Sequence, residues 1–210
     1  MKNRTSLSDF SEERSGELLP ELKNTDQWMC WYYKSDKSGK FRKKPFPGPS
    51  TETLYEQGVA KYSDSRNWLT YTEALSLDRR KDQTDGIGFV LDKRDDFVVL
   101  DIDNCITTST NGVPNSLKKL LADANSYAER SPSGEGVHIL LKGDIPQQGW
   151  TEEREDFRIE IYDNFFITVT EDHIQGTSRK ALSRQDFLDR LFQNHTISWP
   201  DPKFTSYWPE

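Results

Sequence analysis

Short apolar segments bounded by polar turns recur along the 210-residue chain, and their β-branched and aromatic content is typical of β-strands. The predicted strands are residues 27–33, 86–91, 97–103, 137–141, 157–162 and 165–170. Only the polar turn at 92–96 separates the second of these strands from the third, which predicts a strand–turn–strand unit at that point.

Apolar residues at helical spacing predict helices between the strands. The predicted helices cover residues 65–75, 115–122 and 183–192. Trp68, Tyr71 and Leu75 would form the apolar face of the first helix, and Phe187 and Leu191 would point inward from the last. Because helices and strands interleave in mixed order, we expect an α+β single domain with a mixed, largely antiparallel sheet and flanking helices.

The two ends of the chain lack this patterning. Residues 1–20 are polar without a sustained apolar period, and are interpreted as a flexible N-terminal tail. Residues 194–210 carry several prolines and are interpreted as a C-terminal tail or linker. The folded domain is therefore predicted to span residues 21–193.

Hydropathy and cysteine content limit the class of protein. No apolar run approaches the roughly 20 residues that a membrane-spanning helix needs, so we expect a soluble cytoplasmic protein. The two cysteines, Cys30 and Cys105, lie far apart in the sequence. Neither a disulfide framework nor a CxxC zinc module is available to them, which fits a reducing compartment.

The charges of the chain argue both against and for nucleic-acid binding. The formal net charge of -7 counts against a nucleic-acid-binding protein, because affinity for phosphates comes mainly from Lys and Arg. A local basic strip at 34–44 could compensate, and the alternative interpretation is a solvated hairpin loop. Pro45, Pro47 and Pro49 follow the strip and predict an irregular loop.

The first candidate for chemistry is the sequence Asp101-Ile102-Asp103 at the end of a predicted strand. Residues two apart in a strand share a face, so the two carboxylates would lie side by side while Ile102 packs inward. Their mutual repulsion is relieved by solvent or by a cation, and hard oxygen ligands suit Mg²⁺ or Mn²⁺. The alternative is a solvated polar turn.

Two further polar side chains are predicted to be presented by strands in the same way. In the strand at 157–162, Ile159 and Ile161 share one face and Glu160 lies on the other, whereas Asp163 follows the parity of the isoleucines. His138 follows a Gly-rich turn whose backbone could approach a ligand closely. The alternatives are an amphipathic strand with a solvated face and a structural histidine.

In this order, these motifs resemble the catalytic half of archaeal and viral bifunctional DNA primase-polymerases, which belong to the archaeo-eukaryotic primase superfamily. The resembling segments are DIDNC at 101–105, SPSGEGVHI at 131–139, EIYD at 160–163 and FFITVT at 165–170. Weaker likeness extends over residues 27–192. The sequence departs from the pattern at Asn164, where similar sequences carry Arg, and at Glu171, where they carry Gly.

The resemblance implies a catalytic domain with an RRM-like sheet that binds two divalent ions, Mg²⁺ or Mn²⁺. It implies that Asp101, Asp103 and Glu160 are catalytic metal ligands, and that His138 contacts the phosphates of the incoming nucleotide. The implied nucleotide-binding residues are His138, Ser133, Gly134, Lys44 and Arg130.

The function that this implies is a DNA primase or DNA polymerase, a nucleotidyltransferase acting in the replication of an archaeal, plasmid or viral replicon. The expected partners are a single-stranded or primed DNA template and nucleoside triphosphates, with a helicase in the same or a separate chain as a further candidate and no membrane. Two alternatives stay open: a degenerate nucleotide- or nucleic-acid-binding module without catalysis, and a metal-dependent nuclease. The chain would be a free-standing catalytic domain or a fragment of a longer protein.

Overall fold

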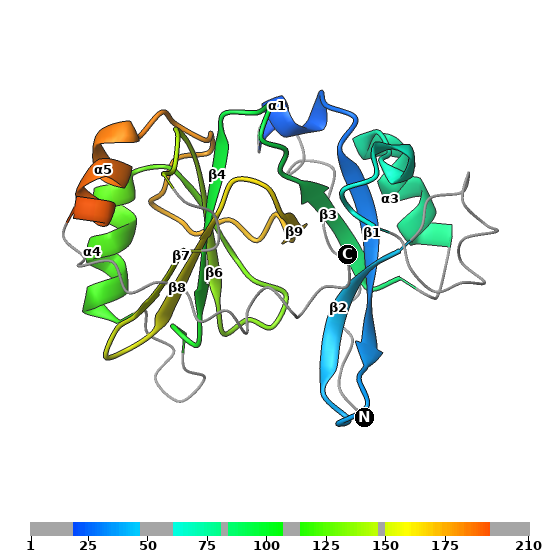
Figure 1. Cartoon of the computed structure of the whole chain (residues 1–210), viewed down its shortest axis with the longest axis horizontal. Coiled ribbons are helices and arrows are strands. Elements are labelled where there is room, and N and C mark those ends of the chain that lie inside the picture. Colours follow the sequence, from blue (N-terminus) through cyan, green and yellow to red (C-terminus); the bar gives the residue numbers. More distant parts are fainter. Residues whose placement is uncertain (1–18, 47–60, 81–83, 107–113, 147–149, 194–210) are drawn as a thin grey trace.

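The computed structural model describes residues 19–46, 61–80, 84–106, 114–146 and 150–193 (Figure 1). The predicted tails lie outside these residues, except that Leu19 is buried and Pro20 begins the first helix. The described helices are α1 (Pro20–Lys23), α3 (Tyr71–Arg80), α4 (Asn115–Ala124) and α5 (Gln185–Gln193), with one 3-10 turn, η4 (Ser65–Asn67). The described strands are β1 (Trp28–Ser35), β2 (Phe41–Phe46), β3 (Gly86–Val90), β4 (Phe97–Asp103), β5 (Tyr127–Arg130), β6 (Val137–Lys142), β7 (Trp150–Glu153), β8 (Arg158–Tyr162) and β9 (Phe166–Val169).

These strands form two sheets, and the domain is α+β as predicted. The first sheet has the order β2-β1-β3-β9 and the second has the order β5-β6-β4-β8-β7. Every pairing between these named strands is antiparallel. The predicted, largely antiparallel α+β domain is therefore confirmed, and its strands are divided between two sheets.

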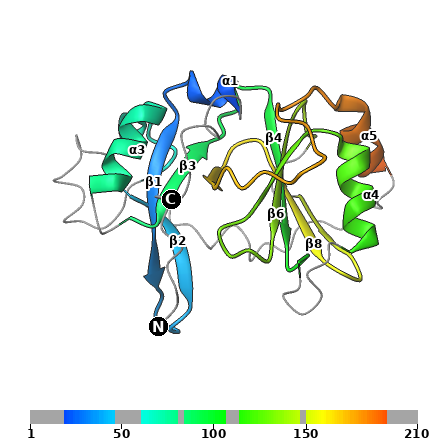
Figure 2. The same cartoon turned by 180° about the vertical axis from the view of Figure 1, so that it is seen from behind.

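Among the described residues, three apolar clusters stabilise the domain, and the two largest hold the sheets and helices together. One core joins the first sheet and α3 to one face of the second sheet, through residues such as Phe89, Ala74 and Val99. The other lies between the opposite face of the second sheet and α4 and α5, where Leu100 and Leu188 are fully buried. Figures 1 and 2 show α4 and α5 covering the outer face of the second sheet, with the first sheet on its other side.

The predicted strand–turn–strand unit is confirmed as β3, a turn and β4, but the two strands do not pair with each other, because they belong to different sheets. β3 pairs with β1 and β9, whereas β4 pairs with β6 and β8. Both strands are buried almost throughout, so each needs a partner on both sides, and distant strands supply them. The turn between them is closed locally by a hydrogen bond from Asp95 N to Asp92 O.

The first predicted helix begins later than expected. Thr70 and Glu73 form a reciprocal capping box: Thr70 N donates to Glu73 Oε2 over 2.9 Å, and Glu73 N donates to Thr70 Oγ1 over 3.2 Å. The helix therefore begins at Tyr71, and Trp68 is extended with φ -79° and ψ 147°.

The predicted loop at the prolines and the list of predicted strands also need correction. Pro45 and Phe46 belong to β2, contrary to the expected irregular loop. β2 is the outer strand of its sheet, where a residue without a backbone N–H is tolerated. The four-residue strands β5 and β7 were not predicted, because their few, mostly polar residues give little periodicity.

Cys30 and Cys105 are both free and buried, in agreement with the prediction that they form no disulfide. Among the described helices, none has the length and apolar character required to cross a bilayer.

Candidate active site

The register of the second sheet places four ionisable residues in one row across its strands. Asp101 on β4 lies directly opposite His138 on β6 and directly opposite Glu160 on β8. His138 in turn lies opposite Glu129 on β5. Directly opposite residues project from the same face of a sheet, so Glu129, His138, Asp101 and Glu160 form a continuous row, the acidic row. Asp103 projects from the same face, two residues further along β4.

The face that carries this row is the one that packs toward the first sheet. Val99 and Leu140, which share the strand parity of Asp101 and His138, belong to the core between the sheets. Leu100 and Ile102, of the opposite parity, pack toward α4 and α5. The acidic row is therefore the polar part of a sheet face that is otherwise apolar.

The two aspartates of β4 repel each other. Asp103 is exposed at the end of β4, but desolvation by its neighbours, followed by the negative charge of Asp101, raises its pKa above the ordinary value. The positive charges of Lys43, Arg158 and His138 oppose this rise. A raised carboxyl pKa means that ionised Asp103 lies in a place short of positive charge, which is the environment that a bound cation would relieve.

Both oxygens of Glu160 are already engaged. Its Oε1 lies 2.6 Å from Arg158 Nη2, and its Oε2 accepts a hydrogen bond from the Tyr162 hydroxyl. Burial raises the pKa of Glu160, and the bonds to Tyr162 and Arg158 offset part of this rise. Arg158 and Tyr162 flank Glu160 on the same strand face, as the parity of β8 predicts.

Three carboxylates on one face are a donor set that suits a hard divalent cation such as Mg²⁺ or Mn²⁺. Asp101, Asp103 and Glu160 thus fit such an ion by chemistry and by strand position. Their side chains do not form the site as they stand: in the part of the chain that the structure describes, no three His, Cys, Asp or Glu residues are grouped closely enough to hold a metal. In this arrangement Glu160 is paired with Arg158.

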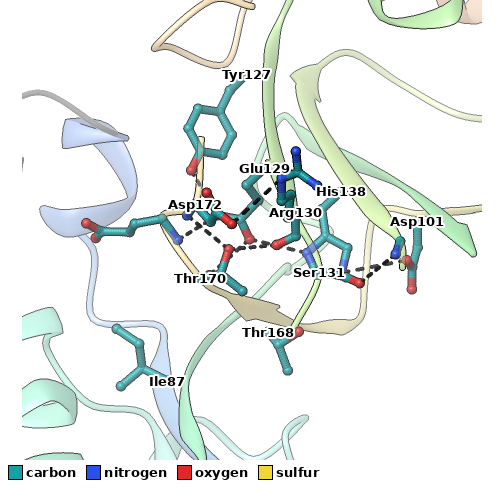
Figure 3. A network of polar contacts seen from close by, with 12 residues as sticks. Ile87, Asp101, Tyr127, Glu129, Arg130, Ser131, His138, Thr168, Thr170 and Asp172 are labelled. Carbon is teal, nitrogen blue, oxygen red and sulfur yellow. Dashed lines mark hydrogen bonds and ion pairs between the residues drawn. The ribbon is translucent and has the colours of Figure 1, made fainter. Parts of the chain in front are cut away.

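His138 is buried between two carboxylates (Figure 3). Its Nδ1 lies 3.3 Å from Glu129 Oε1, and its Nε2 lies 3.6 Å from Asp101 Oδ1. Burial lowers the pKa of His138, but the hydrogen bond to Glu129 and the charge of Asp101 outweigh burial and raise the pKa above its ordinary value. The imidazole is thus suited to carry a positive charge within the acidic row, between Glu129 and Asp101.

Glu129 is a site residue that the sequence analysis did not find. Its side chain is buried, and it accepts hydrogen bonds from the Tyr127 hydroxyl at 2.8 Å, Thr170 N at 3.1 Å and Glu171 N at 3.0 Å (Figure 3). With His138, four groups surround this one carboxylate. The only signal in the sequence was the alternation in Tyr127–Arg130, which puts Glu129 on the face opposite to Ala128.

Lys43 is the lysine of the basic strip that interacts electrostatically with the acidic row, whereas the sequence analysis had named Lys44 as a nucleotide-binding residue. Lys43 Nζ lies 3.4 Å from Thr168 Oγ1, on β9. Burial lowers the pKa of Lys43, and the charges of Asp101, Asp103 and Glu129 oppose this effect, so the amine lies within electrostatic reach of the acidic row.

Lys44 has the opposite strand parity. Its pKa is lowered by partial burial and by the neighbouring charges of Arg42 and Lys34, while Asp36 opposes this. Its electrostatic neighbours thus include Arg42, Lys34 and Asp36 of the hairpin.

The Gly-rich turn before β6 is closed by its own hydrogen bonds. Ser131 N donates to Gly136 O over 2.9 Å, and Gly136 N donates to Ser131 Oγ over 3.1 Å. Ser133 and Gly134 are exposed at its tip, and Gly134 has a φ of 77°. Arg130 precedes the turn, half exposed, with its Nε 3.9 Å from Asp172 Oδ2.

One departure from the family pattern has a structural counterpart. Glu171, at the position where similar sequences carry Gly, has a φ of 57°, in the left-handed region that favours glycine. Its Oε1 lies 3.0 Å from Lys23 Nζ and accepts a hydrogen bond of 2.9 Å from the Tyr71 hydroxyl. These two contacts compensate for the strained backbone. Asn164, the other departure, lies in the turn between β8 and β9.

The fold and the site together define an α+β domain of two antiparallel sheets, one of which carries a row of acidic residues with a buried histidine among them. The sequence is similar to that of the DNA Primase-polymerase of Nitratiruptor phage NrS-1, with 28% identity over 161 residues. The match covers 75% of this chain and 21% of the phage protein, so the chain spans about a fifth of the length of that relative. No family model matches the sequence. The similarity supports a relationship to primase-polymerases.

Proposed function

We propose that this chain is a nucleotidyltransferase domain that joins nucleotides on a nucleic-acid template, as a DNA primase or DNA polymerase does. The observation that carries the proposal is the row of Asp101, His138 and Glu160 on adjacent strands, with Asp103 beside it. The phage relative, a DNA Primase-polymerase whose similarity covers most of this chain, supports the same chemistry.

The acidic residues would hold divalent cations. Asp101 and Asp103 would bind the ions directly, and Glu160 would join them when its contact with Arg158 is released. When bound, the ions would lower the pKa of the attacking hydroxyl and neutralise the developing charge on the triphosphate.

Positive groups beside the acids would bind the triphosphate. His138, whose pKa is raised, can donate from Nε2 toward the row while Glu129 holds Nδ1. Lys43 reaches the same place from the first sheet, so the nucleotide would be held between the two sheets. A chain with a net charge of -7 needs such local compensation to attract an anionic substrate.

The arrangement of Glu160 favours a second candidate function, a binding module that holds nucleotide or nucleic acid without turnover. An arginine that occupies a carboxylate of the acidic row competes directly with a metal ion. In that case, binding would persist without divalent cations and chain extension would not occur.

A template-dependent extension assay with a primed DNA, with nucleoside triphosphates and with Mg²⁺ or Mn²⁺ tests the proposal. We expect the parent to extend the primer, and Asp101→Asn and Glu160→Gln to lose at least about 100-fold of the activity, as removal of a metal ligand implies. Asp163→Asn is the matched control, because Asp163 lies outside β8 and off the row.

Three results would count against the proposal. Extension by Asp101→Asn at the rate of the parent would exclude the acidic row as the catalytic centre. Tight nucleotide binding without any extension would leave the binding module as the function. Degradation of the primer in place of extension would indicate a nuclease.

A further inference from the structure

The turn of the β1–β2 hairpin projects beyond the other described elements, and its own hydrogen bonds order it (Figures 1 and 2). Asp36 Oδ1 accepts hydrogen bonds from Ser38 N at 2.9 Å and Lys40 N at 3.0 Å. Asp36 Oδ2 accepts another from Arg42 Nε at 3.0 Å. The turn of the hairpin is therefore closed by hydrogen bonds to Asp36.

Two aromatic side chains on this hairpin are exposed to solvent. Phe41 is 68% exposed and Tyr33 is 40% exposed, which makes them the two most exposed large hydrophobic residues of the described chain. Phe41 lies opposite Ser35, and Tyr33 lies opposite Lys43, so Phe41 and Tyr33 are diagonal neighbours on one face.

The aromatic row continues into the buried part of the same face. Trp31 and Tyr33 are in edge-to-face contact, with ring centroids 5.1 Å apart. Lys43 lies on this face as well, and it is the lysine within electrostatic reach of Asp101 and Asp103. The face thus leads from an exposed aromatic tip toward the acidic row.

The same hairpin concentrates positive charge in an otherwise acidic protein. Residues 34–44 contain six Lys or Arg residues and one acidic residue, Asp36, whereas the whole chain carries a net charge of -7. Lys34, Lys37 and Lys40 are exposed. Exposed aromatic rings next to basic side chains are the combination by which proteins bind single-stranded nucleic acid, through base stacking and phosphate contacts.

We propose that this hairpin face, made of Tyr33 and Phe41 with the exposed Lys37 and Lys40 of the adjoining turn, binds single-stranded DNA. Two bases stack on Phe41 and Tyr33, and the lysines contact the backbone phosphates. The inference rests on the proposed function in one respect: the bound strand is the template that leads to the acidic row. The binding itself requires no catalysis.

Fluorescence anisotropy of a labelled 20-nucleotide oligothymidylate, titrated with the whole chain, tests the inference. Because loss of one stacked base costs affinity, we expect Phe41→Ala and Tyr33→Ala each to weaken binding about 5- to 100-fold. Phe41→Trp should retain the affinity of the parent, because it preserves a stacking surface. Leu182→Ala, at the remaining exposed large hydrophobic side chain, should leave binding unchanged.

The salt dependence separates stacking from phosphate contacts. Lys37→Ala with Lys40→Ala should reduce the slope of log affinity against log salt by about 1 to 2, whereas Phe41→Ala should leave the slope unchanged. Unchanged affinity in both Phe41→Ala and Tyr33→Ala would overturn the inference. So would equal affinity for the oligonucleotide and for an acidic polypeptide such as polyglutamate, which would indicate a charge-driven protein-binding surface.

The DNA-binding titration and the primer-extension assay together distinguish this inference from the proposed function. If the parent fails to extend a primer but Phe41→Ala still weakens DNA binding, the hairpin site stands and the nucleotidyltransferase proposal fails. If extension proceeds and the hairpin variants bind DNA normally, the nucleotidyltransferase proposal stands and the hairpin site fails. Asp101→Asn is expected to bind the oligonucleotide as the parent does, because Asp101 lies on the other sheet.

Discussion

Glu129 is a buried carboxylate whose partners come from two strands and from the segment after β9. A buried charge is tolerated only when donors surround it, and here two backbone N–H groups, a tyrosine hydroxyl and an imidazole do so. The residue therefore orients His138 and fixes the chain at Thr170 at the same time.

Replacing Glu129 by Gln keeps its shape and removes its charge. We expect Glu129→Gln to lower the free energy of unfolding by about 1–3 kcal/mol, because one amide oxygen cannot accept all of these donors. Urea unfolding of the parent and the variant measures the difference. Glu135→Gln, on the exposed turn, is the control, and equal losses in the two variants would refute a special role for Glu129.

The two neighbouring lysines of β2 should differ in function. Lys43 lies within electrostatic reach of the acidic row, and Lys44 has the charges of the hairpin as neighbours. We expect Lys43→Met to weaken nucleotide binding about 10- to 150-fold, the loss of one charge-assisted hydrogen bond. Lys44→Met should change it by less than about 3-fold. Titration with a labelled nucleotide decides, and the opposite ranking would mean that the nucleotide lies elsewhere.

Strand parity was enough to predict that Asp101, Asp103, Glu160 and His138 are polar side chains presented by strands, and the register brings them to one face. It was not enough to find Glu129. The position of Glu129 beside His138 depends on which strand pairs with β6, and that pairing is not a property of the local sequence. The reach of Lys43 across to the second sheet depends on tertiary packing for the same reason.

At the scale of elements, the turn between β5 and β6 depends on one glycine for space. A Cβ at Gly136 would lie 2.8 Å from Ser131 Oγ and 2.9 Å from Ile102 O, closer than real contacts allow. A Cβ at Gly134 would meet no atom within 4 Å, and its only obstacle is a φ of +77°.

These two glycines make a matched pair of substitutions. We expect Gly136→Ala to cost about 1–3 kcal/mol of folding free energy and also to displace His138, two residues further on. Gly134→Ala should cost about 1 kcal/mol, from backbone strain alone. Chemical denaturation of both variants measures this, and a greater loss in Gly134→Ala would mean that the turn can expand around a side chain.

Elements with a strong local pattern were predicted closely. The strand predicted at 97–103 coincides with β4, because its apolar run and its polar end are both unambiguous. The helix predicted from residue 65 begins at Tyr71, because a capping box decides where a helix starts more strongly than apolar spacing does. The separation of β3 and β4 into two sheets follows from long-range pairing, which the short turn between them does not reveal.

For the whole molecule, the raised pKa values at the site make stability depend on pH. Asp103 has a pKa raised above the ordinary 3.8, so the folded protein binds that proton more tightly than the unfolded chain does. This contribution to stability is present below the ordinary pKa and is lost as the pH rises through the raised pKa. His138 has the same sign, with loss above its ordinary 6.5.

Asp103→Asn should therefore gain thermal stability relative to the parent as the pH rises. In EDTA, we expect the two melting temperatures to be close near pH 4 and to diverge up to about pH 7, with the variant higher. Mg²⁺ should reduce the difference by stabilising only the parent. Differential scanning calorimetry tests both statements, and a pH-independent difference would mean that Asp103 is freely solvated.

The last two strands that the structure describes are divided between the sheets, since β8 joins the second sheet beside β4 and β9 joins the first beside β3. Until residues 158–169 have been synthesised, both central strands keep one edge unpaired, so a nascent chain exposes two sites for aggregation at once. The pairings that close the sheets join residues far apart in sequence, and such contacts make folding slow. Neither sheet can complete its strand pairing before the other. We therefore expect the two halves to fold in one cooperative step, after the β8–β9 segment has been synthesised.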